Sequence, residues 1–481
     1  MEGSKTLTGP DEVLPSLEAI QRARSSLLET LPDDGLGADH VEAHLKREIV
    51  PGLNRPSQSS HYYGFVIGGA TTAARTADHI AVEVDQNVHV HLPKETVATD
   101  VEDRATHMVC ELLNLTPEHW PHRIFSTGAT ASNVLGLACG REHVIQKSAS
   151  HASSQQSISV AEMGTHKAMM WAGISDVQIL TTVPHSSLRK AASIVGLGRA
   201  AVIDVGRIDL PHRFDMAFLE DHLREEKTAC IVAVSCAEVN TGLFATDGND
   251  MARIRALCDK YGAWLHVDAA FGLLARILPP NDEYSVLNAG VAGLELADSI
   301  TGDAHKLLNV VSLYKTFYNT NAAYLNTGSS ETTASKDRTI PSPLNIGIEN
   351  SRRFRALPVY ATLAAYGKNG YRDMLERQIR LARGIAKWIM ESSRYELLPP
   401  ASTGTSRSDI LKSIYIVVLF RARDGALNES LVQRINSSRR MYVSGTQWIG
   451  KPAARFAIAT WLVDPERDLP LVITELDKAT Q

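Results

Sequence analysis

Cysteine is scarce in this chain, with five among 481 residues, and no two of them have the C-x-x-C spacing. An odd number of widely separated cysteines does not make a disulfide framework. Most of the five lie in apolar runs, which is typical of buried, reduced thiols in a reducing compartment. The sequence therefore argues against a disulfide-bonded secreted protein.

Long apolar runs and an excess of one charge are also absent. No segment approaches the roughly 18 consecutive apolar residues of a membrane-spanning helix, and residues 1–20 lack the basic and apolar regions of a secretory signal. Asp and Glu number 54 against 49 Lys and Arg, a net charge of −5, and no basic block is present. We expect a cytoplasmic protein that binds neither a membrane nor nucleic acid.

Short apolar segments alternate with amphipathic ones between about residues 121 and 325. Residues 201–205, 230–236 and 263–270 predict buried strands, and residues 251–262 predict the helix before the last of them. Such alternation predicts an α/β domain with a mostly parallel sheet.

The flanking regions have different patterns. Residues 11–31 have the apolar spacing of a helix. Residues 327–343 are polar and predict a loop that could act as a lid. Long helices at 351–367 and 371–390, followed by strands at 413–422 and 454–463, predict a small α+β domain at the C-terminal end. We place the domains at residues 1–90 (helical), 91–345 (large α/β) and 346–481 (small).

The strongest local feature is DSITGDAHKLLN at residues 298–309, where Lys306 directly follows a histidine in a turn of small residues. A partly desolvated lysine there would have a neutral amine that can form a Schiff base. A single lysine is more often a solvated surface residue, so this motif needs support from others.

The segment HVDAA at 266–270 places Asp268 at the end of an apolar strand. A carboxylate is costly to bury unless it is paired. A pyridinium nitrogen would pair it, as in enzymes that use pyridoxal phosphate (PLP), and the two alanines would leave room for a flat ring. Taken alone, Asp268 could equally cap a helix or a turn.

Two further segments fit the same cofactor. FSTGATASN at 125–133 is a loop of small residues that opens a helix, and backbone N–H groups there could bind a phosphate. The alternative is simple capping of that helix by Thr130 or Ser132. His185, ahead of an amphipathic helix, could stack on a ring, although a structural histidine is the commoner case.

Together these four segments, in this order, resemble the group II PLP-dependent amino-acid decarboxylases. The resemblance covers residues 61–461, and HVDAA followed by D-x-H-K-x-x-N is its most specific part. It implies the type I, aspartate-aminotransferase fold, PLP as cofactor and an L-amino acid as substrate. It also implies a homodimer with the active site at the interface and the N-terminal helices exchanged between subunits.

The resemblance assigns a role to each matching residue. Lys306 matches the lysine that forms the Schiff base with PLP, and Asp268 matches the carboxylate that keeps the pyridine nitrogen protonated. His185 matches the histidine stacked on one ring face, and Ala270 the residue packed against the other.

The remaining matches concern the phosphate and the proton. Ala129 and Thr130 match phosphate-binding positions, His305 matches the histidine before the lysine, and Asp303 matches a position near phosphate and substrate. Tyr324 matches the tyrosine that protonates the substrate carbon after CO2 leaves in the aromatic amino-acid decarboxylases. A tyrosine there favours simple decarboxylation over aldehyde formation.

Phe65, His89 and His91 fall by resemblance near the substrate side-chain pocket, which makes an aromatic amino acid the favoured substrate. If residues 88–91 formed a strand, His89 and His91 would share a face and could ligate a metal. No Cys or carboxylate set completes such a site, so we expect no metal.

One departure and two alternatives stand beside this hypothesis. Glu238 lies where the family often has a threonine, which leaves the local contact to the cofactor in question. The same scaffold could instead run another PLP reaction, either oxidative decarboxylation to an aldehyde or carbon–carbon bond cleavage. It could also be an inactive PLP-fold binding protein, although Lys306, Asp268 and His185 are all intact.

Overall fold

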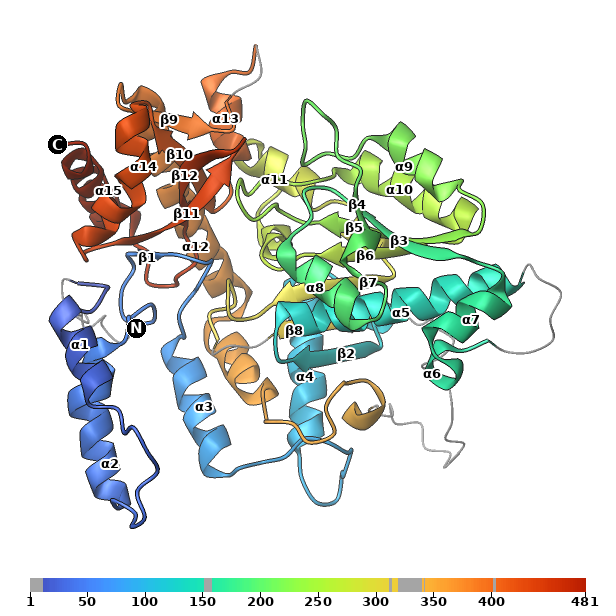
Figure 1. Ribbon diagram of the computed structural model, residues 1–481, viewed down its shortest axis with the longest axis horizontal. Coiled ribbons are helices and arrows are strands. Elements are labelled where there is room, and N and C mark those ends of the chain that lie inside the picture. The colour runs from blue at the N-terminus through green and yellow to red at the C-terminus, as the bar shows by residue number, and fades with distance from the viewer. Residues whose placement is uncertain (1–11, 151–157, 311–313, 319–339, 341, 401–403) are drawn as a thin grey trace. The chain divides into compact units, whose positions relative to one another are not determined.

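The computed structural model describes residues 12–150, 158–310, 314–318, 340, 342–400 and 404–481 (Figure 1). Its contacts divide the chain into two compact units. One consists of residues 70–376, and the other combines residues 1–69 with residues 377–481. Each unit is built around its own sheet.

A seven-stranded sheet forms the centre of the 70–376 unit, with strand order β2-β8-β7-β6-β5-β3-β4. Strands β7, β6, β5, β3 and β4 run parallel, and β8 is antiparallel to both of its neighbours, β2 and β7. The strands are β2 (His122–Ser126), β3 (Asp176–Thr181), β4 (Val202–Asp204), β5 (Thr228–Ser235), β6 (Trp264–Asp268), β7 (Ser299–Asp303) and β8 (Tyr314–Tyr318).

The α-helices of this unit are α3 (Thr72–Glu83), α4 (Ala98–Leu112), α5 (Ala129–Ser150), α6 (Val160–Met163), α7 (Thr165–Ala172), α8 (Ser186–Ile194), α9 (Met216–Leu223), α10 (Gly248–Tyr261) and α11 (Ser285–Gly290). The boundary between the units falls within α12 (Ala356–Glu391), whose backbone is non-helical at Gly367.

Local sequence explains these elements. Six consecutive residues of β5, Ala229–Val234, are buried, as expected of a parallel strand covered on both faces. Helix α10 begins at a capping box in which Asp247 accepts from the N–H of Asp250 while the Asp250 side chain accepts from the N–H of Asp247. It ends at Gly262, whose left-handed backbone (φ 70°) terminates the helix.

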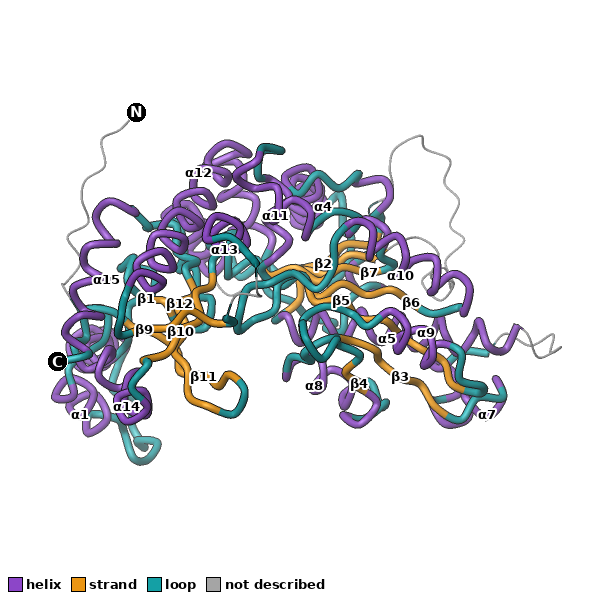
Figure 2. Tube along the Cα trace, turned by 90° about the horizontal axis from the view of Figure 1, so that it is seen from above, coloured by secondary structure: helices purple, strands orange, loops and turns teal. Residues whose placement is uncertain are grey.

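Helices cover both faces of this sheet. Figure 2 shows α5 and α10 on opposite sides of the strands, and α5 contacts β5, β6, β7 and β8. Helix α5 approaches closely because it has glycines where it crosses β6. A Cβ on Gly140 would lie 2.8 Å from the Trp264 ring, and one on Gly136 would lie 2.5 Å from the His266 ring. Residues larger than glycine would push α5 away from the sheet.

The other unit contains a five-stranded sheet of order β1-β11-β12-β10-β9, antiparallel except for the β1–β11 pair. Its strands are β1 (Tyr62–Tyr63), β9 (Tyr395–Leu398), β10 (Val417–Ala422), β11 (Tyr442–Trp448) and β12 (Lys451–Ala457). Its helices are α1 (Leu17–Ser25), α2 (Ala38–His44), α13 (Arg407–Ser413), α14 (Gly425–Ser437) and α15 (Pro465–Ala479).

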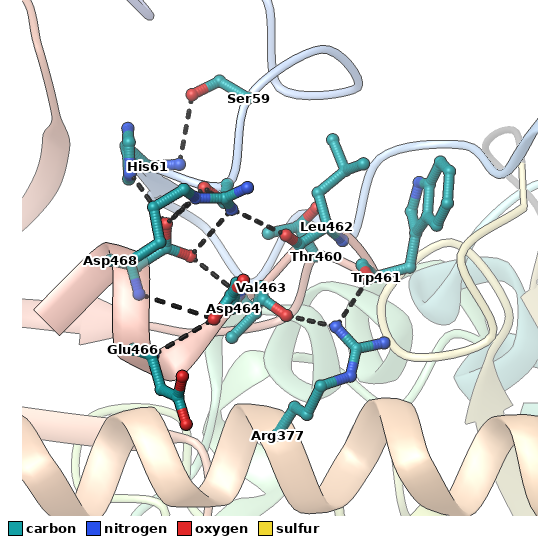
Figure 3. Close-up of polar contacts among 12 residues, drawn as sticks. Ser59, His61, Arg377, Thr460, Trp461, Leu462, Val463, Asp464, Glu466 and Asp468 are labelled. Carbon is teal, nitrogen blue, oxygen red and sulfur yellow. Dashed lines mark hydrogen bonds and ion pairs between the residues drawn. The ribbon is translucent and has the colours of Figure 1, made fainter. Parts of the chain in front are cut away.

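A buried ion cluster joins the segment before β1 to α15, as Figure 3 shows. Asp468 is fully buried, and its Oδ1 lies 3.0 Å from the Ser60 hydroxyl, 3.1 Å from His61 Nε2 and 2.7 Å from Arg467 Nε. A buried carboxylate with this many donors is satisfied. The cluster therefore anchors the N-terminal segment to residues more than 400 positions later.

The structure confirms the α/β domain and its mostly parallel sheet. The strands predicted at 201–205, 230–236 and 263–270 correspond to β4, β5 and β6, and the predicted helix 251–262 corresponds to α10. Several predictions were wrong in extent. The strand predicted at 413–422 begins only at Val417, after helix α13, and the helix predicted at 351–367 begins only at Ala356. Strand β12 ends at Ala457, well before residue 463, because its pairing with β10 ends at the Ala457–Val417 pair.

The helix predicted at residues 11–31 covers only Leu17–Ser25 in the structure. None of its residues is fully buried, and Leu31, beyond its end, is 93% exposed. A short helix gains little without a packed apolar face, so the apolar spacing alone did not extend it.

The contact-based units differ from the domain limits placed at residues 90 and 345. Residues 12–69 group with the C-terminal residues because of contacts such as the β1–β11 pair and the Asp468 cluster. None of the described helices is long and apolar enough to cross a membrane.

Candidate active site

The carboxyl ends of neighbouring strands bring the predicted residues together. Strand β6 ends at Asp268 and β7 at Asp303, and the two strands pair in parallel with Asp268 opposite Thr301. In an open α/β sheet, ligands bind at this edge. Lys306 lies in the turn that follows β7.

Lys306 is largely buried, with 15% of its side chain exposed. Its Nζ lies 3.7 Å from Asp303 Oδ2 and 5.5 Å from the centre of the Phe271 ring. The exposed Lys260 also has a carboxylate and an aromatic ring nearby, so it is burial that distinguishes Lys306 from a solvated lysine. The structure thus places Lys306 in the partly desolvated setting that a nucleophilic amine requires.

Asp303 is a buried carboxyl group whose Oδ1 accepts a hydrogen bond from the His305 N–H at 2.9 Å. Burial raises its pKa to about 7, against the lowering effect of Lys306, and the nearby Asp268 adds to the increase. Burial, and then Lys306, lowers the pKa of His305 to about 4. Near neutral pH, Asp303 can therefore hold or release a proton, whereas His305 is neutral.

Asp268 is held by two N–H donors. Its Oδ2 accepts from Asn133 Nδ2 at 2.8 Å, and its Oδ1 accepts from the Ala270 N–H at 3.3 Å. The Oδ1 of Asn133 in turn lies 3.1 Å from His266 Nε2. Asp268 therefore accepts two hydrogen bonds, and the one from Ala270 caps the turn after β6, whereas the helix that follows has Phe271 as its N-cap.

His185 follows β3 and is the N-cap residue of α8. Its Nδ1 accepts from the Ser187 N–H at 3.2 Å and lies 2.6 Å from the Ser187 hydroxyl. Because Nδ1 is an acceptor, the neutral ring has its proton on Nε2. The ring is exposed, so one of its faces is accessible to a flat ligand.

The predicted phosphate loop joins β2 to α5. Ala129 and Thr130 are the first residues of α5 and are half-buried. The Ser126 hydroxyl lies 2.7 Å from the Ser132 hydroxyl and 3.2 Å from the Gly128 carbonyl, which also accepts from the Ser132 N–H. N–H groups at a helix start have no acceptor within the helix and favour an anion.

Two orphaned polar atoms test whether these residues fit PLP. Thr301 Oγ1 and Asp303 Oδ2 are buried, and neither has a hydrogen-bond partner among the described residues. They lie two residues apart on β7 and so share a face. Buried polar atoms without a partner are costly, and a polar ligand would satisfy them. Together with Lys306 and Asp268, they make a site that PLP fits.

Two predicted residues, Tyr324 and Phe65, fall outside the described part of the 70–376 unit. Tyr324 is outside the described residues, as is most of the 327–343 segment. Phe65 belongs to the other unit, where its ring is 58% exposed and 6.0 Å from that of Tyr442.

His89 lies in a bend and His91 directly follows it, so neither is in a strand and the strand geometry considered for a metal pair is wrong. His91 Nδ1 lies 2.7 Å from the Thr99 hydroxyl. Across the ranges that the structure describes, no three His, Cys, Asp or Glu side chains are grouped to hold a metal.

The Glu238 side chain points toward the loop to which it belongs. Its carboxylate accepts from the N–H groups of Asn240 and Thr241 and from the Thr241 hydroxyl, each at 2.9 Å. Glu238 thus closes the 237–243 loop, and the described contacts of its carboxylate lie within that loop.

Four residues of the site were missed by the sequence analysis, namely Asn133, His266, Ser299 and Trp264. A signal existed for each of them. His266 precedes Asp268 by two residues on a strand and shares its face, and Asn133 follows Thr130 by three residues on a helix. The same alternation applies to the other two, because Trp264 precedes Asp268 by four residues on β6 and Ser299 precedes Asp303 by four residues on β7.

Comparisons with known proteins agree with this geometry. The family model of the pyridoxal-dependent decarboxylase conserved domain matches residues 21–405. L-2,4-Diaminobutyrate decarboxylase of Acinetobacter baumannii is 28% identical over 57% of this chain and 53% of that protein. Tryptophan decarboxylase 1 of Oryza sativa subsp. japonica is 24% identical over 88% of this chain and 81% of its own.

Among solved structures, that of Oryza sativa TDC with PLP and tryptamine superposes with a TM-score of 0.77. The match covers 98% of this chain and 92% of that one at 18% identity, and so it establishes the fold.

Proposed function

Because the chain belongs to the pyridoxal-dependent decarboxylase family, we propose that Lys306 binds PLP and that an L-amino acid with an aromatic side chain is the substrate. The protein is a PLP-dependent carboxy-lyase of the type I fold. The observation that supports Lys306 is its largely buried amine, which lies beside Asp303 at the sheet edge where Asp268 also lies.

Each end of the cofactor has a partner in this proposal. Asp268 would hold a proton at the ring nitrogen, and His185 and Ala270 would lie against the two ring faces. Ala129 and Thr130 would bind the phosphate at the start of α5. When bound, PLP supplies an electron sink for the electron pair left on the substrate as CO2 departs.

The protein's own residues move the protons. Asp303 can accept, at Oδ2, the proton that the Lys306 ammonium loses before its amine can act as a nucleophile. The two groups are 3.7 Å apart, so they must approach to hydrogen-bond distance for the transfer, and the pKa of about 7 places proton exchange at Asp303 near neutral pH. Tyr324 or His185 would supply the proton that replaces CO2 on the α-carbon.

Relatives support an aromatic substrate without agreeing on a single one. Tryptophan decarboxylase 1 aligns with most of this chain, whereas the diaminobutyrate enzyme aligns with about half of it. Phe65, His89 and His91 are the residues that we propose contact the substrate side chain.

Two further proposals concern the state of the protein. Exposed leucines in the N-terminal segment support a homodimer, because a partner subunit would cover them; they are Leu17, Leu27, Leu28 and Leu31. All five cysteines are buried and free, which supports a cytoplasmic location.

The test of the lysine compares Lys306→Ala with Lys190→Ala, a change at an exposed lysine of α8. With PLP added, the wild type and Lys190→Ala should show visible absorption from covalently bound cofactor, and Lys306→Ala should not. Borohydride reduction and peptide mapping should label Lys306. Retained absorption in Lys306→Ala, or a label on another lysine, would disprove the assignment.

The test of the reaction measures CO2 release from tryptophan, tyrosine, 2,4-diaminobutyrate and glutamate. The aromatic substrates should react fastest, and one amine should form per CO2 without oxygen uptake. Oxygen uptake with an aldehyde product, a product that keeps its carboxylate, or no turnover of any substrate would each overturn the proposed reaction.

A further inference from the structure

Five side chains form one continuous chain of hydrogen bonds that ends at Asp268. Trp264 Nε1 lies 2.9 Å from Ser299 Oγ, which lies 2.8 Å from His266 Nδ1. His266 Nε2 lies 3.1 Å from Asn133 Oδ1, and Asn133 Nδ2 lies 2.8 Å from Asp268 Oδ2. The first four residues are buried, and they come from β6, β7 and α5.

The two ends of this chain determine its direction. The Trp264 indole N–H can only donate, and the Asp268 carboxylate can only accept. Asn133 must therefore turn its N–H₂ group toward Asp268 and its oxygen toward His266. An oxygen facing Nε2 requires that Nε2 have the proton.

His266 is neutral, because complete burial lowers its pKa to about 4 although Asp268 acts in the opposite sense. With the proton on Nε2, Nδ1 has a free lone pair and accepts the Ser299 hydroxyl proton. The Ser299 oxygen then accepts from Trp264. Each link of the chain thus joins one donor to one acceptor, and only one arrangement of protons achieves this.

We propose that Trp264, Ser299, His266 and Asn133 are positioning residues, whose directed chain holds the Asp268 carboxylate toward the ring nitrogen of PLP. The proposal rests on the function proposed above. It adds that His266 is neutral and links its neighbours by donating one hydrogen bond and accepting another. His266 does not transfer a proton in the reaction and does not stack on the cofactor ring.

The chain of hydrogen bonds also links the two ends of the cofactor site, the phosphate end at the start of α5 and the ring-nitrogen end at Asp268. Asn133 lies three residues after Thr130 on α5, so the hydrogen bond from Asn133 to Asp268 ties the phosphate end of the site to the end of β6. Gly136 leaves space for the imidazole, because a Cβ there would lie 2.5 Å from the His266 ring. Helix α5 thus packs directly against the His266 ring at Gly136.

The experiment compares three variants of the full-length protein. His266→Gln keeps one donor and one acceptor in place of the imidazole, whereas His266→Phe keeps the ring shape and has neither. His143→Phe is the matched control, because His143 is a partly buried histidine of α5 whose ring lies 5.2 Å from that of Trp264 and is not part of the chain.

PLP affinity is measured by titrating the apoenzyme, and the visible absorption of the bound cofactor is followed from pH 6 to 9. His266→Phe should weaken PLP binding about tenfold, because Asn133 loses the hydrogen bond that orients it and its own hydrogen bond to the charged Asp268 is thereby weakened. It should also shift the pH at which the absorption changes. His266→Gln should stay within about threefold of the wild type, and His143→Phe should match it.

Ser299→Ala is the milder variant in case His266→Phe does not fold, since it removes one hydroxyl from the middle of the chain. It should change affinity and absorption in the same direction as His266→Phe, by less. Wild-type affinity and an unchanged pH profile in folded His266→Phe, or in Ser299→Ala, would overturn the proposal. Because borohydride labelling of Lys306 tests the proposed function separately, either idea can fail alone.

Discussion

His266 should make the protein sensitive to acid, because protonating it breaks the chain that ends at Asp268. Its pKa is about 4 in the folded protein, against 6.5 for an unperturbed histidine. Between these values the unfolded chain binds a proton that the folded protein does not. The stability that neutral His266 contributes is therefore complete above pH 6.5 and is lost as the pH falls toward 4.

The size of the effect follows from the shift. One pKa unit corresponds to about 1.4 kcal/mol, so lowering the pH from 7.5 to 4.5 should cost about 2–3 kcal/mol at this residue. Asp303 acts in the opposite sense. Its pKa is raised from 3.8 to about 7, so it destabilises the fold as the pH rises through that range. A pH profile of the wild type alone would mix the two effects.

The assay is therefore a difference between two proteins. Urea unfolding of wild type and His266→Gln is followed by tryptophan fluorescence at pH 7.5, 6.0, 5.0 and 4.5, without added cofactor. Gln does not titrate and Asp303 is present in both, so the difference in free energy of unfolding, wild type minus His266→Gln, should fall by about 2–3 kcal/mol between pH 7.5 and 4.5. A difference that stays constant across this range would refute the neutral, buried His266.

Two further predictions concern packing around the site. Arg352 donates to both oxygens of the buried Glu102 carboxylate and to the carbonyls of Val88 and Phe125, so Arg352→Met should cost about 3–5 kcal/mol in urea unfolding. The double variant Arg352→Met/Glu102→Leu should regain part of the lost free energy of unfolding, because it leaves no unpaired buried charge, but not all of it, because the two carbonyls still lack a donor. If the double variant regained no stability, the buried-charge explanation would be wrong. Glu238→Ala should cost about 1–3 kcal/mol, since three donors of its loop lose their acceptor, and Glu238→Gln should cost less. A larger loss of PLP affinity than of stability in Glu238→Ala would instead indicate contact with the cofactor.

Local patterns predicted much of the architecture because they act over a few residues. The apolar run in β5 and the capping box of α10 each depend on neighbours in sequence, so both elements were found. The N-terminal helix was overestimated because its apolar residues are not buried: α1 contacts the helical turns at residues 45–52, yet none of its residues is buried. The end of β12 depended on where β10 begins, which no pattern within residues 454–463 reveals.

The sequence by itself determined the chemistry of the site: a lysine after a histidine, an aspartate closing a strand, a loop of small residues opening a helix. These motifs are short, and their reactivity follows from the residue types. Only the tertiary structure decided which partners hold them, because Asn133 and Asp268 are 135 positions apart and meet only when α5 packs on β6. It likewise decided that Asp303 has a raised pKa and that Glu238 faces its own loop, since burial and hydrogen bonding depend on what surrounds a residue in space.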